Sequence, residues 1–488
     1  MSEMSSIQVS LQPKLDQLEC HFTWDIKKVD LVLTDVLNRL EEQVKMGLGQ
    51  ELGVARTHCS LGYLEFLLEH KERALTHLLK SETLIKENLG ENCDKTLIVT
   101  YGNLAWINYH MKNFSECESY LIKLQKINET LPTQPSSVPE VLGEKGWAYL
   151  KFSHKYYGRA VEVFQKAVEL DPENSEWNAG YAKALYRMEP GASCTVDSPA
   201  IKQLRLAIDD NPDDNASRSL LGLKLLFCSK KLMDESEKLM EIALKGSPED
   251  PHVIRYVGKY FRNQGSVDRS IALLMKALGR SPDSGFIHHQ LAMCYKKKKI
   301  DLQKKNPDRG SQRNPDRGSQ TEVNNARNEC IYYLEKATSL KANFIFAMSE
   351  LALQYGERGE LSKADNLFHR TFKTAREKND SVHVVHCFFA EFQQYSKRCE
   401  KLAIRHYKDC FEMNPHSSEG KRSAKKLMII AQRRIKVEPD DWEANEILGL
   451  IYQHSEATKS YLATSDNEED DEYHNNLSEC FKGCTIDG

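Results

Sequence analysis

Three cations share one face of a predicted helix near the middle of the chain. In HVIRYVGKYFRNQG (252–265), Arg255, Lys259 and Arg262 follow one another at i, i+4 and i+7, a spacing that places them on one stripe. Because like charges on one stripe repel one another, the arrangement is unfavourable unless an anion meets it. Guanidinium groups bind phosphate and carboxylate oxygens through paired hydrogen bonds, so the stripe predicts a surface that binds an anionic ligand.

Two lysines fall at helical positions that usually pack against other helices. Lys151 follows Trp147 by four residues in KGWAYLKF (145–152), and Lys183 lies in EWNAGYAKALYR (176–187). A buried ammonium group is unfavourable unless its face lines a hydrated cavity, which predicts a polar pocket between the two helices. In the alternative interpretation, the lysine stems lie along apolar surface and only the ammonium groups reach water.

Aromatic rings and neutral donors accompany these cations. Trp147, Tyr157 and Tyr256 are interleaved with them, and His289 and Gln290 add hydrogen-bond donors without adding much charge. Cations that grip phosphate oxygens, together with rings that stack on bases, suit a nucleic-acid strand. A terminal phosphate is more negative than an internal phosphodiester, so a closed basic pocket favours a 5′ end.

Four prolines recur at similar distances and reveal an internal repeat. Pro172, Pro212, Pro248 and Pro282 follow amphipathic stretches at spacings of 40, 36 and 34 residues. The tetratricopeptide repeat has a period of 34 residues and consists of two helices, and a proline cannot continue a helix. Gly258 falls where the two helices of a repeat cross closely. The sequence therefore predicts an all-α fold, a tetratricopeptide-repeat α-solenoid (a superhelix) with a positively charged central groove or pocket.

The repeat register assigns a direction to the basic stripe. Arg255, Lys259 and Arg262 take positions 5, 9 and 12 of a first helix, and these positions line the concave surface of a tetratricopeptide solenoid. The stripe is therefore predicted to face the groove. The predicted helix pairs are 54–86, 96–127, 139–172, 173–212, 215–248, 252–282, 284–340, 343–376, 383–415 and 442–460.

We divide the chain into five segments on these grounds. The segments are an N-terminal helical segment that feeds the pocket (1–50), the N-terminal and central repeats (51–250), the central to C-terminal repeats with a basic insertion at 296–327 (251–415), C-terminal helices with a degraded repeat (416–461), and an acidic disordered tail (462–488).

The insertion at 296–327 is rich in lysine, proline, glycine and serine. It holds ten Lys/Arg against four Asp/Glu and contains NPDRGSQ twice. This composition predicts a flexible loop. The loop is either a tolerated surface insertion or an auxiliary contact to nucleic acid.

Composition and motifs exclude several classes of function. The net charge is only −4, so any basic site must be local. Thirteen cysteines without CxxC pairs indicate a reduced, intracellular protein, and no stretch is apolar enough for secretion or a membrane span. No P-loop, HExxH or metal-spaced cysteines are present. We therefore expect a cytoplasmic protein that is not an enzyme and has neither cofactor nor metal, and we interpret HVVH (383–386) as a helical face.

The chain resembles the interferon-induced proteins with tetratricopeptide repeats, antiviral RNA-binding effectors. The resemblance spans about residues 15–455 and implies a cytosolic helical protein that captures the 5′ end of foreign single-stranded RNA. That end is a triphosphate or a cap that lacks 2′-O-methylation. The stretches that support it are LECHFTW (18–24), YGNLAWINYHM (101–111), KGWAYLKF (145–152), DPENSEWNAGYAKALYR (171–187), IRYVGKYFRNQGSVD (254–268) and FIHHQLAMCYK (286–296).

The resemblance also implies roles for individual residues. Trp147 and Glu176 would hold a cap base, and Tyr157 would stack on a nucleotide. Lys183 would lie beside the base or cap, while Lys259 and Arg262 would follow the RNA backbone onward. The residues implied to contact the 5′ phosphates or first nucleotides are Arg39, Gln43, Lys151, Arg187, Arg255, Tyr256, His289 and Gln290.

Departures from the family pattern concern the choice of ligand. Lys183 and Ala216 stand where cap-binding members have an apolar residue and a tyrosine, and Asp214 stands where an asparagine is expected. A lysine disfavours a cationic methylated guanine, so we expect 5′-triphosphate RNA to be favoured over capped RNA. The predicted function is an antiviral innate-immune effector that sequesters such RNA and blocks its translation, alone or as an oligomer with itself or other family members. The alternative is a tetratricopeptide scaffold that binds acidic peptide termini.

Overall fold

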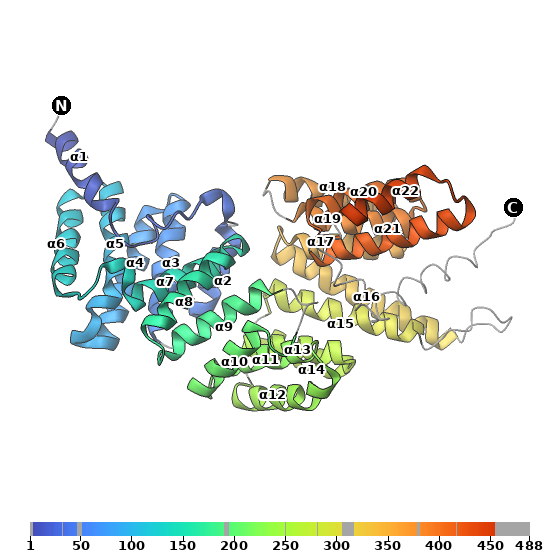
Figure 1. The fold of residues 1–488 in the computed structure, drawn as a ribbon, viewed down its shortest axis with the longest axis horizontal. Helices are drawn as coiled ribbons and strands as arrows, with labels where there is room; N and C mark the ends of the chain where they lie inside the picture. Colours follow the sequence, from blue (N-terminus) through green and yellow to red (C-terminus); the bar gives the residue numbers. More distant parts are fainter. Residues whose placement is uncertain are drawn as a thin grey trace. The chain divides into compact units, whose positions relative to one another are not determined.

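Every regular element of the described chain is helical (Figure 1). The computed structural model describes residues 3–31, 33–45, 51–189, 195–248, 250–280, 282–304, 317–377, 381–415 and 417–453. Within these ranges there is no β-strand, and consecutive α-helices pair along the chain. The predicted all-α repeat fold is confirmed.

Two helices precede the repeats, α1 (Glu3–Leu15) and α2 (Leu33–Lys45). The paired helices are α3 (Glu51–Leu67) with α4 (Lys71–Leu89), α5 (Asp94–His110) with α6 (Phe114–Thr130), α7 (Pro139–Phe152) with α8 (Tyr157–Leu170), α9 (Ser175–Met188) with α10 (Pro199–Asp210), α11 (Asn215–Leu225) with α12 (Met233–Gly246), α13 (Pro251–Gln264) with α14 (Val267–Arg280), α15 (Gly285–Lys304) with α16 (Arg317–Leu340), α17 (Ile345–Glu357) with α18 (Leu361–Glu377), α19 (Val382–Glu391) with α20 (Glu400–Met413), and α21 (Ser418–Val437) with α22 (Trp442–Gln453).

Glycine positions show why the helices can pack so closely. A Cβ on Gly180 in α9 would lie 2.4 Å from the Phe164 ring of α8, and one on Gly258 in α13 would lie 3.1 Å from Leu274 in α14. Small residues are therefore required where helices cross. Gly265 has a φ of +98° and ends α13, as expected for a glycine that follows the last turn of a helix.

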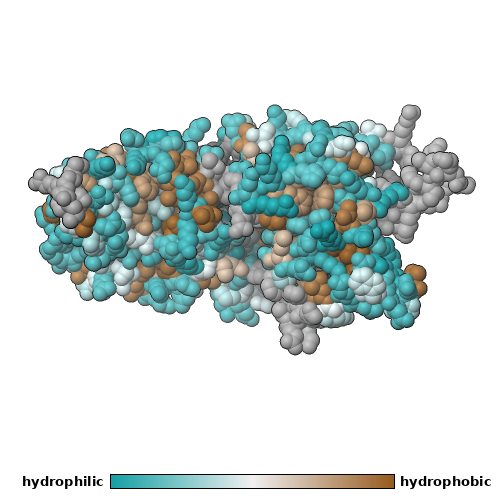
Figure 2. Space-filling model, turned by 90° about the horizontal axis from the view of Figure 1, so that it is seen from above, coloured by the Kyte–Doolittle hydropathy of each residue, from teal (hydrophilic) through white to brown (hydrophobic). Residues whose placement is uncertain are grey.

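The chain divides into two compact units, Met1–Tyr256 and Val257–Gly488. The first unit has a continuous apolar core that runs from α1 to α9, and the second has a separate core around α19 to α22. Viewed from above, the surface is mostly hydrophilic with small scattered apolar groups (Figure 2). No helix among the described residues is long and apolar enough to cross a membrane.

The segment between α1 and α2 is anchored inside the first unit by hydrogen bonds from tyrosine hydroxyls to its backbone carbonyls. Tyr149 donates to the Trp24 carbonyl at 2.9 Å, and Tyr63 donates to the Ile26 carbonyl at 3.1 Å. The Trp24 side chain is only 2% exposed. These contacts fix the start of α2 against α3 and α7, so the N-terminal segment is a built part of the repeat core.

The predicted flexible loop at 296–327 is wrong at both ends. Helix α15 continues to Lys304 and α16 begins at Arg317; residues 305–316 lie outside the described chain, as does the acidic tail. The physical reason is charge pairing: Lys296 Nζ lies 2.9 Å from Glu350 Oε2, and Lys299 is bound to Glu357 and Gln354 of α17. The lysine run is thus a helical face held by acids.

The cysteines agree with a reduced chain at most described positions. Cys20, Cys59, Cys117 and others are free thiols. Cys228 is not among these free thiols.

Candidate nucleic-acid interface

Lys151 on α7 is the most strongly perturbed cation of the first unit. Its Nζ lies 3.4 Å from Thr57 Oγ1 of α3 and 5.6 Å from the ring centroid of Trp147. Burial, followed by the positive charges of Arg56 and Arg39, lowers the pKa of Lys151 to about 7. An anion bound beside this lysine would favour its protonated form.

Lys183 on α9 approaches the same tryptophan. Its Nζ lies 5.9 Å from the Trp147 ring centroid and 3.0 Å from Asp214 Oδ2. Both predicted lysines therefore reach one indole, which supports the polar site that the sequence predicted between α7 and α9. The buried Nε1 of Trp147 has no hydrogen-bond partner among the described residues, which leaves a donor for a ligand.

Two arginines extend this group toward α13, and each lies against a tyrosine. Arg187 Nη1 donates to the Tyr157 hydroxyl at 2.9 Å, and the Arg255 guanidinium lies 4.4 Å from the Tyr256 ring centroid. Cation–π contact at these distances holds the guanidinium planes beside the rings. We call Lys151, Lys183, Arg187 and Arg255 the cation cluster.

Neighbouring groups report the electrostatic potential of the cation cluster. Burial lowers the pKa of His252 to about 3, and all four cations of the cluster lower it further. Burial alone would raise the pKa of Tyr256, yet Arg255, Arg187 and Lys183 bring it below its ordinary value. The cluster therefore creates a strongly positive environment that favours an anion.

Arg39 and Glu176 have protein partners in this structure. Arg39 on α2 donates to the backbone carbonyl of Lys151, which connects the N-terminal helix to the cluster. Gln43 follows one turn later and is half-buried. Glu176, predicted to contact a cap base, forms an ion pair with Arg56 of α3.

Four predicted contact residues belong to the second unit. Arg262 Nη1 donates to Gln290 Oε1 at 2.8 Å. Burial lowers the pKa of His289 to about 4, and its ring centroid lies 4.8 Å from that of Phe344. Lys259 is exposed on α13. The His289 imidazole and the Gln290 amide therefore contribute hydrogen-bond donors and acceptors, and neither adds a positive charge.

Sequence reasoning missed Arg56, which the structure places at the centre of the first-unit site. Its side chain is only 8% exposed, it pairs with Glu176, and its guanidinium lies 5.5 Å from the Trp177 ring centroid. Burial lowers its pKa to about 10. The available signal was an arginine that directly follows Val54 and Ala55 in a predicted repeat helix, because a buried cation needs a partner.

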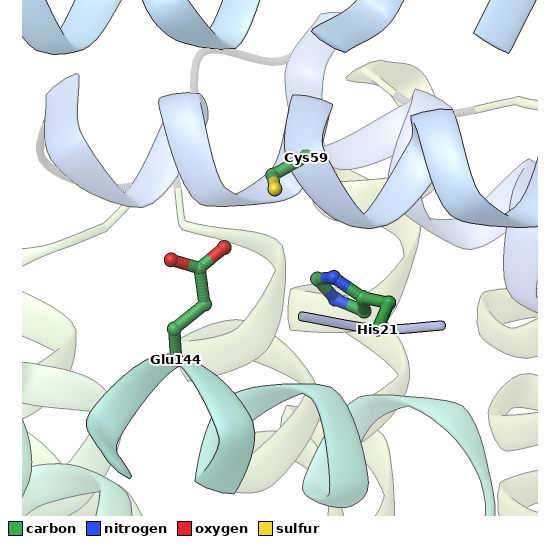
Figure 3. Close-up of side chains that lie close together, drawn as sticks. All are labelled: His21, Cys59 and Glu144. Atoms are coloured by element: carbon green, nitrogen blue, oxygen red, sulfur yellow. The ribbon is translucent and has the colours of Figure 1, made fainter. Parts of the chain in front are cut away.

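Among the described residues, two groups of side chains could hold a metal ion, although the sequence predicted none. His21, Cys59 and Glu144 converge from the N-terminal segment, α3 and α7 (Figure 3), and their ligand atoms lie within 4.8 Å of one another. All three are buried, and the Glu144 carboxyl, whose pKa burial raises to about 7, faces the charges of Arg56 and Lys151.

The second metal-capable group lies in the second unit. It consists of His386, His406 and Asp409 on α19 and α20. HVVH (383–386) lies on helix α19, as predicted. The sequence did not show that His386 contacts His406 and Asp409 of α20.

Comparison with known proteins identifies close relatives. The tetratricopeptide repeat family model matches residues 139–174. The human antiviral innate immune response effector IFIT1 is 32% identical over 91% of this chain and 92% of its own length. Human interferon-induced protein with tetratricopeptide repeats 2 is 30% identical over 94% of this chain and 95% of its own length.

Solved structures agree with these relatives. A human IFIT1 dimer with m7Gppp-AAAA has a TM-score of 0.75 at 31% identity, covering 96% of this chain and 100% of that one. A human IFIT1 dimer with PPP-AAAA has a TM-score of 0.73 at 30% identity, covering 96% and 99%.

Proposed function

Because the chain belongs to the interferon-induced proteins with tetratricopeptide repeats, we propose that it is an antiviral innate-immune effector that binds the 5′ end of single-stranded RNA at the cation cluster. By sequestering such RNA, it would block translation without catalysing a reaction. The relatives of known structure hold capped or triphosphate RNA, and the observation that carries the proposal here is the cation cluster itself.

Two acids near the cluster pair with cations of the protein. Asp214 pairs with Lys183, and Glu176 pairs with Arg56. The pKa of Lys151 falls to about 7 because burial and neighbouring cations outweigh Glu144. A 5′ triphosphate would bring negative charge to these cations, and Arg187 and Arg255 have the planar geometry that phosphate oxygens prefer.

We propose specific contacts along the RNA. Trp147, Tyr157 and Tyr256 would stack on the first nucleotides, with Arg39 and Gln43 closing the site from α2. The residues proposed to contact the first nucleotides or the following backbone from the second unit are Lys259, Arg262, His289 and Gln290. Phosphate contacts position a strand without reading its sequence, so little sequence preference should result.

We propose that triphosphate RNA is favoured over capped RNA. Lys151 and Lys183 both lie within 6 Å of the Trp147 ring, at 5.6 and 5.9 Å from its centroid. A methylated guanine stacked on this indole would bring a third positive charge to the same ring. A triphosphate brings negative charge instead, and the two ammonium groups would stabilise it.

The decisive experiment compares binding of matched RNAs with triphosphate, cap, 2′-O-methylated cap and hydroxyl 5′ ends. We expect the triphosphate RNA to bind most tightly and its affinity to weaken as salt increases. Arg255→Glu should abolish the preference for triphosphate over hydroxyl RNA. Equal affinities for these two RNAs in the unmodified protein would refute the proposal, and displacement of RNA by an acidic peptide of higher affinity would favour a peptide scaffold.

We also propose a cytoplasmic location and association with a second copy or with another family member. The support is that human IFIT1 forms a dimer in the RNA complexes. Size-exclusion chromatography with light scattering at several protein concentrations tests the association.

A further inference from the structure

Three ligand-type atoms meet at one point of the ninth helix pair, in the second unit. His386 lies on α19, and His406 and Asp409 lie one turn apart on α20. The two Nδ1 atoms are 2.9 Å apart, and Asp409 Oδ2 lies 3.2 Å from the His386 Nδ1 and 3.4 Å from the His406 Nδ1. We propose that these three residues form a Zn²⁺ site with an open fourth position.

The spacing of the three atoms matches zinc coordination. Zinc binds imidazole nitrogen and carboxylate oxygen at about 2.0–2.2 Å in a tetrahedron, so the ligand atoms of a zinc site lie about 3.3–3.5 Å apart. The three separations in this structure are 2.9, 3.2 and 3.4 Å. An ion could therefore enter with ring shifts of a few tenths of an ångström and no movement of α19 or α20.

The two imidazoles come from different helices and turn the same nitrogen toward one point. Both Nδ1 atoms lie close to Asp409 Oδ2, at 3.2 and 3.4 Å. Without a metal, the short distance between the two Nδ1 atoms requires that one ring donate its proton to the other ring or to the carboxylate.

Space for the fourth ligand lies beside His406. A cavity of about 480 Å³ is lined by His406, Phe372, Phe389, Lys373 and Arg376, among others. Arg376 and Arg405 both act on the two histidines, and the cavity is lined by Lys373 and Arg376 and by one acid, Glu377. With two neutral imidazoles and one carboxylate, a Zn²⁺ ion would keep a positive charge that a third neutral ligand would not offset, whereas an anionic ligand such as hydroxide, carboxylate or phosphate would.

The other metal-capable group is a weaker candidate. Cys59 Sγ already accepts a hydrogen bond from Asn103 Nδ2 at 3.1 Å, and the same amide lies 2.9 Å from His21 Nδ1. Burial raises the pKa of the Cys59 thiol well above its ordinary value, and a zinc-bound cysteine must be a thiolate. His21 and Cys59 are both 0% exposed, which gives an ion no described route in.

The test is zinc binding by the full-length protein, prepared without a histidine tag and treated with chelator. Competition with a chromophoric chelator should give one tight site, and Asp409→Asn should weaken it by more than about tenfold, the loss typical of even an outer-shell partner. Asp409 is 34% exposed, so its amide variant should fold normally, as circular dichroism can verify. His406→Gln should have the same effect.

The matched control is a second histidine pair without a carboxylate ligand. His58 Nδ1 and His77 Nδ1 on α3 and α4 are also 2.9 Å apart, but they belong to no metal-capable group of the described residues. His77→Gln should leave zinc affinity unchanged. If His77→Gln weakens binding as much as Asp409→Asn, the proposed site is wrong.

Cobalt substitution distinguishes the two metal-capable groups. Co²⁺ bound by His386, His406 and Asp409 should show visible d–d bands but no intense near-ultraviolet charge-transfer band, because no thiolate is a ligand. A strong near-ultraviolet thiolate band that disappears in Cys59→Ser would place the metal in the other group and overturn the proposal. Failure of the unmodified protein to retain zinc would also overturn it, without bearing on RNA binding.

Discussion

Two buried lysines, one in each unit, respond to burial in opposite directions. Lys151 on α7 has its pKa lowered to about 7 by burial, Arg56 and Arg39. For Lys296 on α15, burial again opposes the charge, but Glu350 at 2.9 Å raises its pKa above the ordinary value. The desolvation is common to both residues, so the difference comes from the carboxylate that one has and the other largely lacks.

The comparison separates a structural cation from a binding cation. In the second unit, the buried positive charges have their counterions within the protein, as Lys296 with Glu350 and Arg422 with Glu391. In the first unit, Glu144 is the acid that raises the pKa of Lys151, and the pKa of Glu144 is itself raised by burial to about 7. A charge without a built-in counterion costs stability, and we attribute its presence to an anionic ligand.

The largest expected effect comes from breaking the paired charge. Lys296→Met would leave Glu350 buried beside Gln354 and the remaining lysine, and we expect the free energy of unfolding to fall by about 3 kcal/mol. Denaturant unfolding monitored by circular dichroism measures this loss. RNA affinity of the folded fraction should stay within about twofold, so a large specific loss of RNA binding without loss of stability would contradict the comparison.

The matching change in the first unit should do the reverse. Lys151→Met removes a cation whose folded-state pKa lies below its unfolded value, a group that destabilises the fold increasingly as pH falls from about 10 to 7. Unfolding free energy at pH 7 should therefore rise, by roughly 1–4 kcal/mol. Affinity for triphosphate RNA should fall by roughly 10- to 100-fold, the value of a hydrogen bond to a charged group. A destabilised variant with normal affinity would make Lys151 a structural residue like Lys296.

The pH dependence of RNA affinity should reveal the protonation of Lys151. Lys151 and Glu144 both have a pKa of about 7 in the free protein, and an anion favours the protonated form of each. Affinity for triphosphate RNA should therefore fall as pH rises from about 6.5 to 8.5, by at most about tenfold per unit for one coupled proton.

The RNA triphosphate ionises in the same range and acts in the opposite direction. Lys151→Arg, which stays charged throughout, is therefore the reference. The ratio of wild-type to Lys151→Arg affinity cancels the contribution of the RNA. A ratio that is constant across this pH range would show that Lys151 does not take up a proton on binding.

The sequence could predict the helices and the direction of the cations, but not their partners. The recurrence of prolines every 34 to 40 residues predicted the helix pairs, and Trp147 with Lys151 marked the site because a lysine on a packing face is locally anomalous. The partners Glu176 of Arg56 and Glu350 of Lys296 lie 120 and 54 residues away. Such distant ion pairs depend on how each helix is rotated about its own axis against its neighbours, and the hydrophobic periodicity of the sequence does not determine that rotation.

The same dependence on distant residues explains the wrong loop prediction. Proline, glycine and serine within 296–327 predicted a flexible loop, but the lysines at 296–299 lie in helix α15, and the acids that pair with Lys296 and Lys299 belong to α17. HVVH does lie on a helix, as predicted, and the contact of His386 with His406 on α20 could not be read from that stretch.

The smallest predicted effect comes from removing the carboxylate that pairs with Lys183 in the first unit. This change tests whether Lys183 is a binding cation like Lys151 or a structural cation like Lys296. Asp214→Asn removes the carboxylate 3.0 Å from Lys183 Nζ but keeps a side-chain oxygen for the Ser217 amide at the start of α11, where asparagine caps a helix as well as aspartate. Triphosphate RNA should then bind about two- to fivefold more tightly, since a partly exposed ion pair is worth up to about 1 kcal/mol. In a Lys183→Met background the gain should shrink to the long-range charge effect. If the full gain persists there, Asp214 acts on the ligand directly, and Lys183 belongs with Lys296 among the structural cations.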